Sequence, residues 1–168
     1  MDFKLLSGQL DLFPYQKLFF TTFRYKELVP VFKLQNTSSI KLEKLGKEES
    51  ILLLTGIASP KQMMQDLQTY TKRIELFAFG DHHDFTRKDM EELEKRFDRM
   101  DGINKIIVTT EKDAARLINH PYLSEKLKPF MYALPIEVCF LQNQEVEFND
   151  YILGYIRKNK RNKIDSRK

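Results

Sequence analysis

The chain has 168 residues, 42% of them hydrophobic, and a formal net charge of +4. This length and composition exclude a disordered chain and suit one ordinary domain with a short appendage. The apolar runs are far shorter than the roughly 18–20 residues of a membrane-spanning helix, and a single cysteine excludes an internal disulfide framework.

Residues 1–45 are predicted to form an interdomain segment that contains a β-ribbon. Tyr15–Phe23 has the pattern of a half-buried strand. Val31–Leu34 and Ile40–Leu42 are extended pieces on either side of a polar turn, and they predict a two-stranded ribbon. A ribbon this small is not stable alone in water, so it must pack on another part of the protein.

Residues 46–156 alternate regularly between strand and helix patterns. Strands are predicted at Ile51–Leu54, Ile74–Phe79, Lys105–Thr109, Met131–Leu134 and, at an edge, Ile136–Leu141. Helices are predicted to start at Ser59-Pro60, at Thr86 with Asp89 completing a capping box, at Ala114 and near Asn149. This alternation predicts an α/β fold with a mainly parallel sheet.

Positive charge is concentrated in residues 157–168, which carry seven Lys/Arg and one Asp. We expect them to form a basic, disordered tail. Its cations could simply be solvated, or they could be attracted to an anionic membrane surface, where each contributes about 1 kcal/mol. Nucleic acid is not an expected partner, because the tail has no aromatic residue for stacking and no nucleic-acid motif is present.

Three turns follow the carboxyl ends of predicted parallel strands, which is where open parallel sheets bind ligands. They lie at residues 55–59, 80–85 and 110–113. Topology should therefore bring their polar residues to one edge of the sheet: Thr55, Asp81, His82, His83, Thr110, Glu111, Lys112 and Asp113.

The pair His82 and His83 has several interpretations. A metal site needs at least three ligands, but consecutive side chains diverge and no distant His or Cys completes a set. A manganese phosphoesterase family has a similar Asp-His-His signature, but its paired Asp-x-Asp motif is absent. One histidine could act as a general acid or base or contact a phosphate, because imidazole titrates near neutral pH. Alternatively, Asp81 caps the turn and a histidine only bonds the backbone.

The turn at 110–113 also has two interpretations. Glu111 and Asp113 suit the first turn of a helix, where carboxylates interact favourably with the helix dipole. Lys112 could be solvated or could meet a phosphate. No Gly-rich phosphate loop occurs in the sequence, so the chain by itself has no visible means of holding a nucleotide. His120, next to Pro121, is predicted to lie in a surface loop.

Three motifs, in this order and spacing, resemble the C-terminal portion of the tetraacyldisaccharide 4'-kinases, the lipid A 4'-kinases of Gram-negative bacteria. They are TGIASP at residues 55–60, FGDHHDFT at 79–86 and VTTEKDA at 108–114. One departure is Gly80, which stands where the family usually has proline. The resemblance covers nearly the whole chain except the basic tail.

The resemblance implies a Rossmann-like, three-layer C-terminal domain, joined by strands to an N-terminal P-loop domain, with ATP in the cleft and Mg2+ held by the P-loop domain. The implied reaction moves the γ-phosphate of ATP to the 4'-hydroxyl of a lipid A disaccharide precursor, at the cytoplasmic side of the bacterial inner membrane, with peripheral attachment. His82 matches the histidine that pairs with a catalytic aspartate of the P-loop domain, and Asp81 would orient His82. Further residues implied to lie near substrate or nucleotide are Thr55, Gly56, His83, Thr110, Glu111, Lys112 and Asp113.

The P-loop portion is not visible in this sequence. Because phosphoryl transfer depends on that loop and on Mg2+, we expect the chain alone to be inactive and to hold neither ATP nor Mg2+. It would be a truncated chain or one piece of a split enzyme. The alternative is a stand-alone, non-catalytic α/β module that binds a phosphorylated ligand or a protein partner through the same edge.

Overall fold

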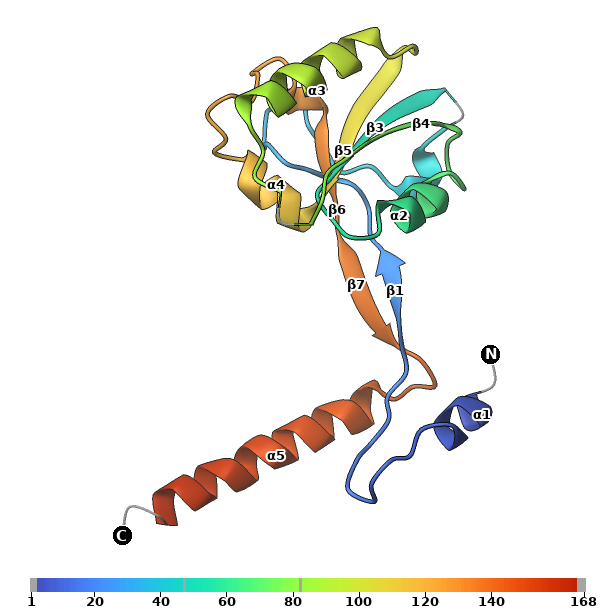
Figure 1. Ribbon diagram of the computed structural model, residues 1–168, viewed down its shortest axis with the longest axis vertical. Helices are drawn as coiled ribbons and strands as arrows, with labels where there is room; N and C mark the ends of the chain where they lie inside the picture. The colour runs from blue at the N-terminus through green and yellow to red at the C-terminus, as the bar shows by residue number, and fades with distance from the viewer. Residues whose placement is uncertain (1–2, 47, 82, 166–168) are drawn as a thin grey trace. The chain divides into compact units, whose positions relative to one another are not determined.

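The computed structural model describes residues 3–46, 48–81 and 83–165 and divides into two compact units (Figure 1). Unit 1 comprises Met1–Arg24 and Glu137–Lys168, and unit 2 comprises Tyr25–Ile136. This division differs from the expected boundaries at residues 45 and 156. Residues 25–45 belong to unit 2 because Leu28, Leu42 and Leu45 are buried in its core.

Unit 2 is built on a five-stranded sheet with the order β2-β6-β5-β3-β4. Its strands are β2 (Val29–Pro30), β3 (Glu49–Thr55), β4 (Arg73–Ala78), β5 (Asn104–Thr110) and β6 (Met131–Leu134). Strands β3 to β6 pair in parallel, and β2 adds an antiparallel edge to β6. In the central register, Leu53 lies opposite Leu76 on one side and Val108 on the other. The predicted mainly parallel sheet is confirmed.

Helices cover both faces of this sheet (Figure 1). On one face, α2 (Pro60–Leu67) and the 3-10 turn η1 (Leu42–Lys44) pack on Ile51 and Leu53. On the other face, α3 (Arg87–Arg99) and α4 (Glu111–Leu117) pack on Leu52 and Leu54. A second 3-10 turn, η2 (Lys128–Phe130), precedes β6. Successive strand side chains point to opposite faces, so the apolar run 51–54 supplies both cores, and the three-layer α/β architecture is confirmed.

Unit 1 contains α1 (Phe3–Gly8), most of β1 (Thr21–Tyr25) and β7 (Ile136–Phe140), and α5 (Glu145–Asp165). Strands β1 and β7 form a separate two-stranded ribbon. The prediction that residues 31–34 and 40–42 form the ribbon is therefore wrong. Instead, the Val31 amide donates to the Met131 carbonyl oxygen and extends the pairing of β2, while Ile40 makes a single bridge with Leu28.

Aromatic side chains pack against one another within unit 1. The ring of Phe19 lies 6.5 Å from that of Phe140 and 5.2 Å from that of Phe148. Lys17 pairs with Glu147 at 2.8 Å. Helix α5 continues through residues 157–165, which we expected to be a disordered tail; the segment contains no proline to stop a helix. No helix in the described part of the chain is long and apolar enough to cross a membrane.

Candidate functional site

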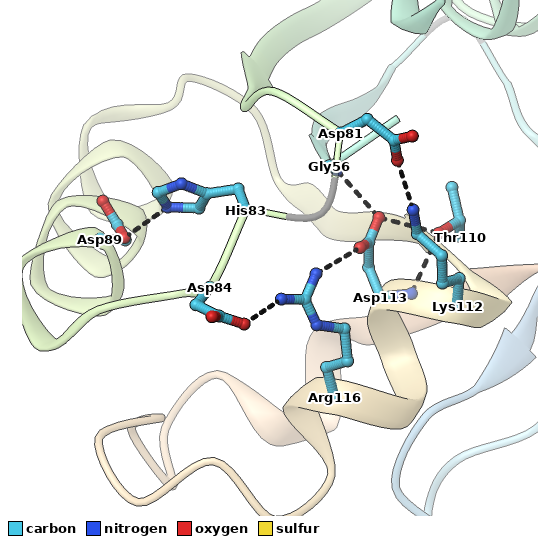
Figure 2. A network of polar contacts seen from close by, with 9 residues as sticks. All are labelled: Gly56, Asp81, His83, Asp84, Asp89, Thr110, Lys112, Asp113 and Arg116. Atoms are coloured by element: carbon cyan, nitrogen blue, oxygen red, sulfur yellow. Dashed lines mark hydrogen bonds and ion pairs between the residues drawn. The ribbon is translucent and has the colours of Figure 1, made fainter. Parts of the chain in front are cut away.

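The carboxyl edge of the sheet in unit 2 is organised around Asp113, which is fully buried. Its Oδ2 accepts hydrogen bonds from the Gly56 amide (2.9 Å) and from the Thr110 hydroxyl (2.8 Å) (Figure 2). Thr110 also caps α4, because its Oγ1 accepts from the Asp113 amide at 3.1 Å. A Cβ at Gly56 would lie 3.3 Å from Asp113 Oδ1, so a side chain there would crowd this contact. These bonds fix the start of α4 against the turn that follows β3.

Two cations of α4 reach across to the turn that contains the histidines. Lys112 Nζ donates to Asp81 Oδ1 at 2.7 Å. Arg116 Nη2 donates to Asp84 Oδ1 at 2.7 Å, and its Nη1 lies 3.7 Å from Asp113 Oδ1. Residues four apart share one face of a helix, and Figure 2 shows both side chains directed at the same turn. Helix α4 therefore contacts the turn at two places, at Asp81 and at Asp84.

His83 is held from the opposite side, by α3. Its Nε2 is 2.9 Å from Asp89 Oδ2, and its ring stacks on Phe79 with centroids 4.3 Å apart and planes inclined by 12°. Asp89 Oδ2 also accepts from the Thr86 amide at 2.7 Å and from the Thr86 hydroxyl at 2.8 Å. The predicted capping box of Thr86 and Asp89 is thereby confirmed.

The same contacts act on the acidity of Asp89. Burial alone would raise the pKa of its carboxyl group. The hydrogen bonds from Thr86 and His83 oppose burial and outweigh it, so the pKa of Asp89 lies below its ordinary value. The ionised form of Asp89 is therefore the form that holds His83.

The remaining predicted residues have less central places. Thr55 ends β3 and is buried; its carbonyl oxygen accepts from the Phe79 amide at 2.8 Å, while no described residue bonds its hydroxyl. Glu111 is the exposed first residue of α4. His82 lies outside the described residues, between Asp81 and His83 in the sequence.

Three residues of this network were not singled out from the sequence as site residues: Asp84, Asp89 and Arg116. Arg116 was missed because the helix was expected to start at Ala114, whereas it starts at Glu111. With the correct start, the spacing of four from Lys112 would have indicated it. His120 follows α4 in a loop, as expected, but it is half-buried and its Nε2 lies 2.9 Å from the Phe85 carbonyl oxygen.

The described residues of this edge do not fit ATP or Mg2+ by themselves. Lys112 and Arg116, the cations of α4 at this edge, already contact carboxyl groups. Within residues 3–46, 48–81 and 83–165, no group of three or more His, Cys, Asp or Glu is arranged to hold a metal ion. What the arrangement can do is hold Asp81, His83 and Asp84, described residues of this turn, against α3 and α4.

Comparisons with known proteins bear on what this turn serves. The family model described as tetraacyldisaccharide-1-P 4'-kinase matches residues 15–156. The chain is 51% identical to the tetraacyldisaccharide 4'-kinase of Phocaeicola vulgatus over 96% of its own length and 44% of the relative's. It is 48% identical to that of Bacteroides thetaiotaomicron, with the same coverage of both chains.

A more distant relative, the tetraacyldisaccharide 4'-kinase of Flavobacterium johnsoniae, is 34% identical over 86% of this chain and 37% of its own length. The chain thus spans less than half the length of these curated relatives. No solved structure matches it. The resemblance inferred from the three motifs is confirmed, and the chain belongs to the tetraacyldisaccharide-1-P 4'-kinase family.

Proposed function

We propose that this chain contributes the histidine turn of a lipid A 4'-kinase. The complete enzyme would transfer the γ-phosphate of ATP to the 4'-hydroxyl of a lipid A disaccharide precursor. The observation that carries the proposal is the network at the carboxyl edge, where Asp113 bonds Gly56 and Lys112 bonds Asp81. These contacts join the three motif turns that carry the resemblance, and relatives 48–51% identical to this chain are 4'-kinases by name.

His82 is the proposed catalytic residue, and its role comes from the resemblance. It would pair with an aspartate of the P-loop domain and assist proton removal from the sugar hydroxyl, a task suited to imidazole near neutral pH. Asp81 would orient the ring of His82.

ATP and Mg2+ belong, in this proposal, to the P-loop domain of the complete enzyme. ATP would supply the γ-phosphate, and Mg2+ with the P-loop would supply the charge stabilisation on which phosphoryl transfer depends. The described residues of this edge do not fit either group, so the chain alone is proposed to be inactive. We further propose peripheral attachment at the cytoplasmic side of the inner membrane, supported by the seven Lys/Arg among residues 157–168.

A domain exchange tests this function. This chain would replace the matching 44% of the Phocaeicola vulgatus kinase, and phosphorylation of tetraacyldisaccharide-1-phosphate by ATP would be measured. We expect turnover by the exchanged protein and none by the chain alone. A folded exchanged protein without turnover would contradict the proposal and would favour the non-catalytic binding module.

The role of Asp81 is tested by Asp81→Asn in the exchanged protein. If Asp81 orients His82, kcat should fall about tenfold or more while the KM for ATP stays the same. Asp98→Asn is the matched control, because Asp98 also accepts from a lysine, Lys126, at 2.6 Å. Equal kcat values for the two variants would remove Asp81 from the mechanism.

A further inference from the structure

We propose that Arg116 is a positioning residue for the histidine turn. It would connect the buried carboxyl group of Asp113 to Asp84 and so fix the backbone at His83 and Asp84. That the turn is needed for phosphoryl transfer rests on the proposed function; that Arg116 holds the turn does not.

The first observation is the environment of Asp113. From described residues, its side chain accepts hydrogen bonds at Oδ2, donated by Gly56 and Thr110. Oδ1 is buried, and no described residue donates a hydrogen bond to it. A buried polar atom without a partner is destabilising. Arg116 Nη1, at 3.7 Å, places a positive charge beside this oxygen.

The second observation is the other end of the same guanidinium group. Nη2 donates to Asp84 Oδ1 at 2.7 Å, and the group lies 5.3 Å from the centroid of the Phe85 ring. The planar guanidinium group presents several donors in fixed directions, so it can face two carboxyl groups at once, whereas a lysine is a single point charge. Arg116 therefore contacts two consecutive residues of the turn, Asp84 and Phe85, and also the buried Asp113.

The third observation is how the described residues of the turn are restrained. Among them, the His83 amide donates to the Gly80 carbonyl oxygen at 3.2 Å. Gly80 has open space where a Cβ would be, and glycine is the least restricted residue. Contacts from the neighbouring helices add restraint to this turn. Asp89 supplies it from α3, and Lys112 and Arg116 supply it from α4.

An exposed ion pair alone contributes little to stability, and the Asp84 side chain is fully exposed. What distinguishes Arg116 is its second contact, to a residue that is fully buried and bonded to Gly56. A change at Arg116 should therefore be detected at two places, the turn and the Gly56 amide.

Amide hydrogen exchange of the full 168-residue chain, followed by NMR, provides the test. In Arg116→Met, exchange at the His83 and Gly56 amides should become about tenfold faster or more, because local opening becomes easier. Arg116→Lys, which keeps the charge but not the fork, should be intermediate. Lys126→Met is the matched control, since Lys126 also pairs with partly exposed carboxylates, and it should change neither amide. Slow exchange at the core residue Leu53 verifies folding. Unchanged exchange at both amides in Arg116→Met would overturn the proposal.

Turnover of the exchanged protein gives the second readout. Arg116→Met should lower kcat about tenfold or more without changing the KM for ATP, as expected for misplaced catalytic geometry. A raised KM with unchanged kcat would assign Arg116 to nucleotide binding and overturn the positioning role. The positioning role would also be overturned if Arg116→Met kept full turnover while His82→Ala had lost turnover. Full turnover in His82→Ala would instead overturn the proposed catalytic role of His82, while the exchange rates would still decide whether Arg116 holds the turn.

Discussion

Two sets of ion pairs on unit 2 use the same chemistry but differ in what they connect. Lys126 lies 2.6 Å from Asp98 and 3.5 Å from Glu94, so it ties a loop to α3 through partly exposed side chains. At the carboxyl edge, Arg116 contacts Asp84, which is exposed, and Asp113, which is fully buried. Only the second set reaches the interior. The difference indicates that an ion pair can position a site when one of its members is itself fixed by buried hydrogen bonds.

The largest effect on stability should come from Asp113→Ala. It leaves the buried Gly56 amide without its acceptor and removes a partner of the Thr110 cap. Together these losses should lower the free energy of unfolding by about 2–4 kcal/mol. Urea denaturation of the full chain measures it. Asp98→Ala, in the exposed set, should have little effect, and equal losses in the two variants would contradict the distinction between the sets.

A smaller effect, with a defined pH dependence, is expected for Asp89→Asn. Loss of the ionised cap and of the contact to His83 should cost about 1 kcal/mol at pH 7. The pKa of Asp89 is lowered by folding, so its contribution is fully present above the unfolded pKa of about 4 and is lost as the pH falls through the folded value. The stability difference between wild type and variant should therefore shrink below about pH 4. A difference that stays constant into acid would contradict this assignment.

The smallest effect should come from Tyr25→Phe, on the face of the sheet away from the histidine turn. The Tyr25 hydroxyl donates to Asp66 Oδ2 at 3.0 Å. Burial, and then this bond, raise the pKa of Tyr25 to about 12. Removing the hydroxyl should lower the free energy of unfolding by about 0.5–1 kcal/mol.

Because folding raises the pKa of Tyr25, its contribution is complete below about pH 10 and is lost as the pH rises toward about 12. Amide exchange at Gly56 and His83 should not change in Tyr25→Phe. Faster exchange at those amides would mean that the carboxyl edge is not independent of this contact.

Local patterns were sufficient for much of unit 2. The apolar run 51–54, the cap of Thr86 with Asp89 and the strand 131–134 were all predictable, because each depends on neighbours in the sequence. The pairing of β1 with β7 was not, because its strands are far apart in the chain and their pattern does not specify a partner.

At the site, the topology of parallel strands was enough to bring together Asp81, Thr110, Lys112 and Asp113. The topology could not indicate which carboxyl group each cation would contact. The contact of Arg116 with Asp84 depends on where α4 starts and on its rotation against the sheet. Thr110 caps the start of the helix, and the buried bond from Gly56 to Asp113 ties that start to the turn after β3. Tertiary contacts of this kind leave no local signal.

Catalysis by His82 is tested by transfer of labelled γ-phosphate from ATP to tetraacyldisaccharide-1-phosphate in the exchanged protein with His82→Ala. We expect kcat to fall about 100-fold or more, with an unchanged KM for ATP, since an imidazole that assists proton transfer typically contributes that much. Lys126→Met should keep full turnover, and slow exchange of the Gly56 amide should show that the edge remains folded. Undiminished turnover in His82→Ala would show that His82 is not the catalytic histidine of this turn.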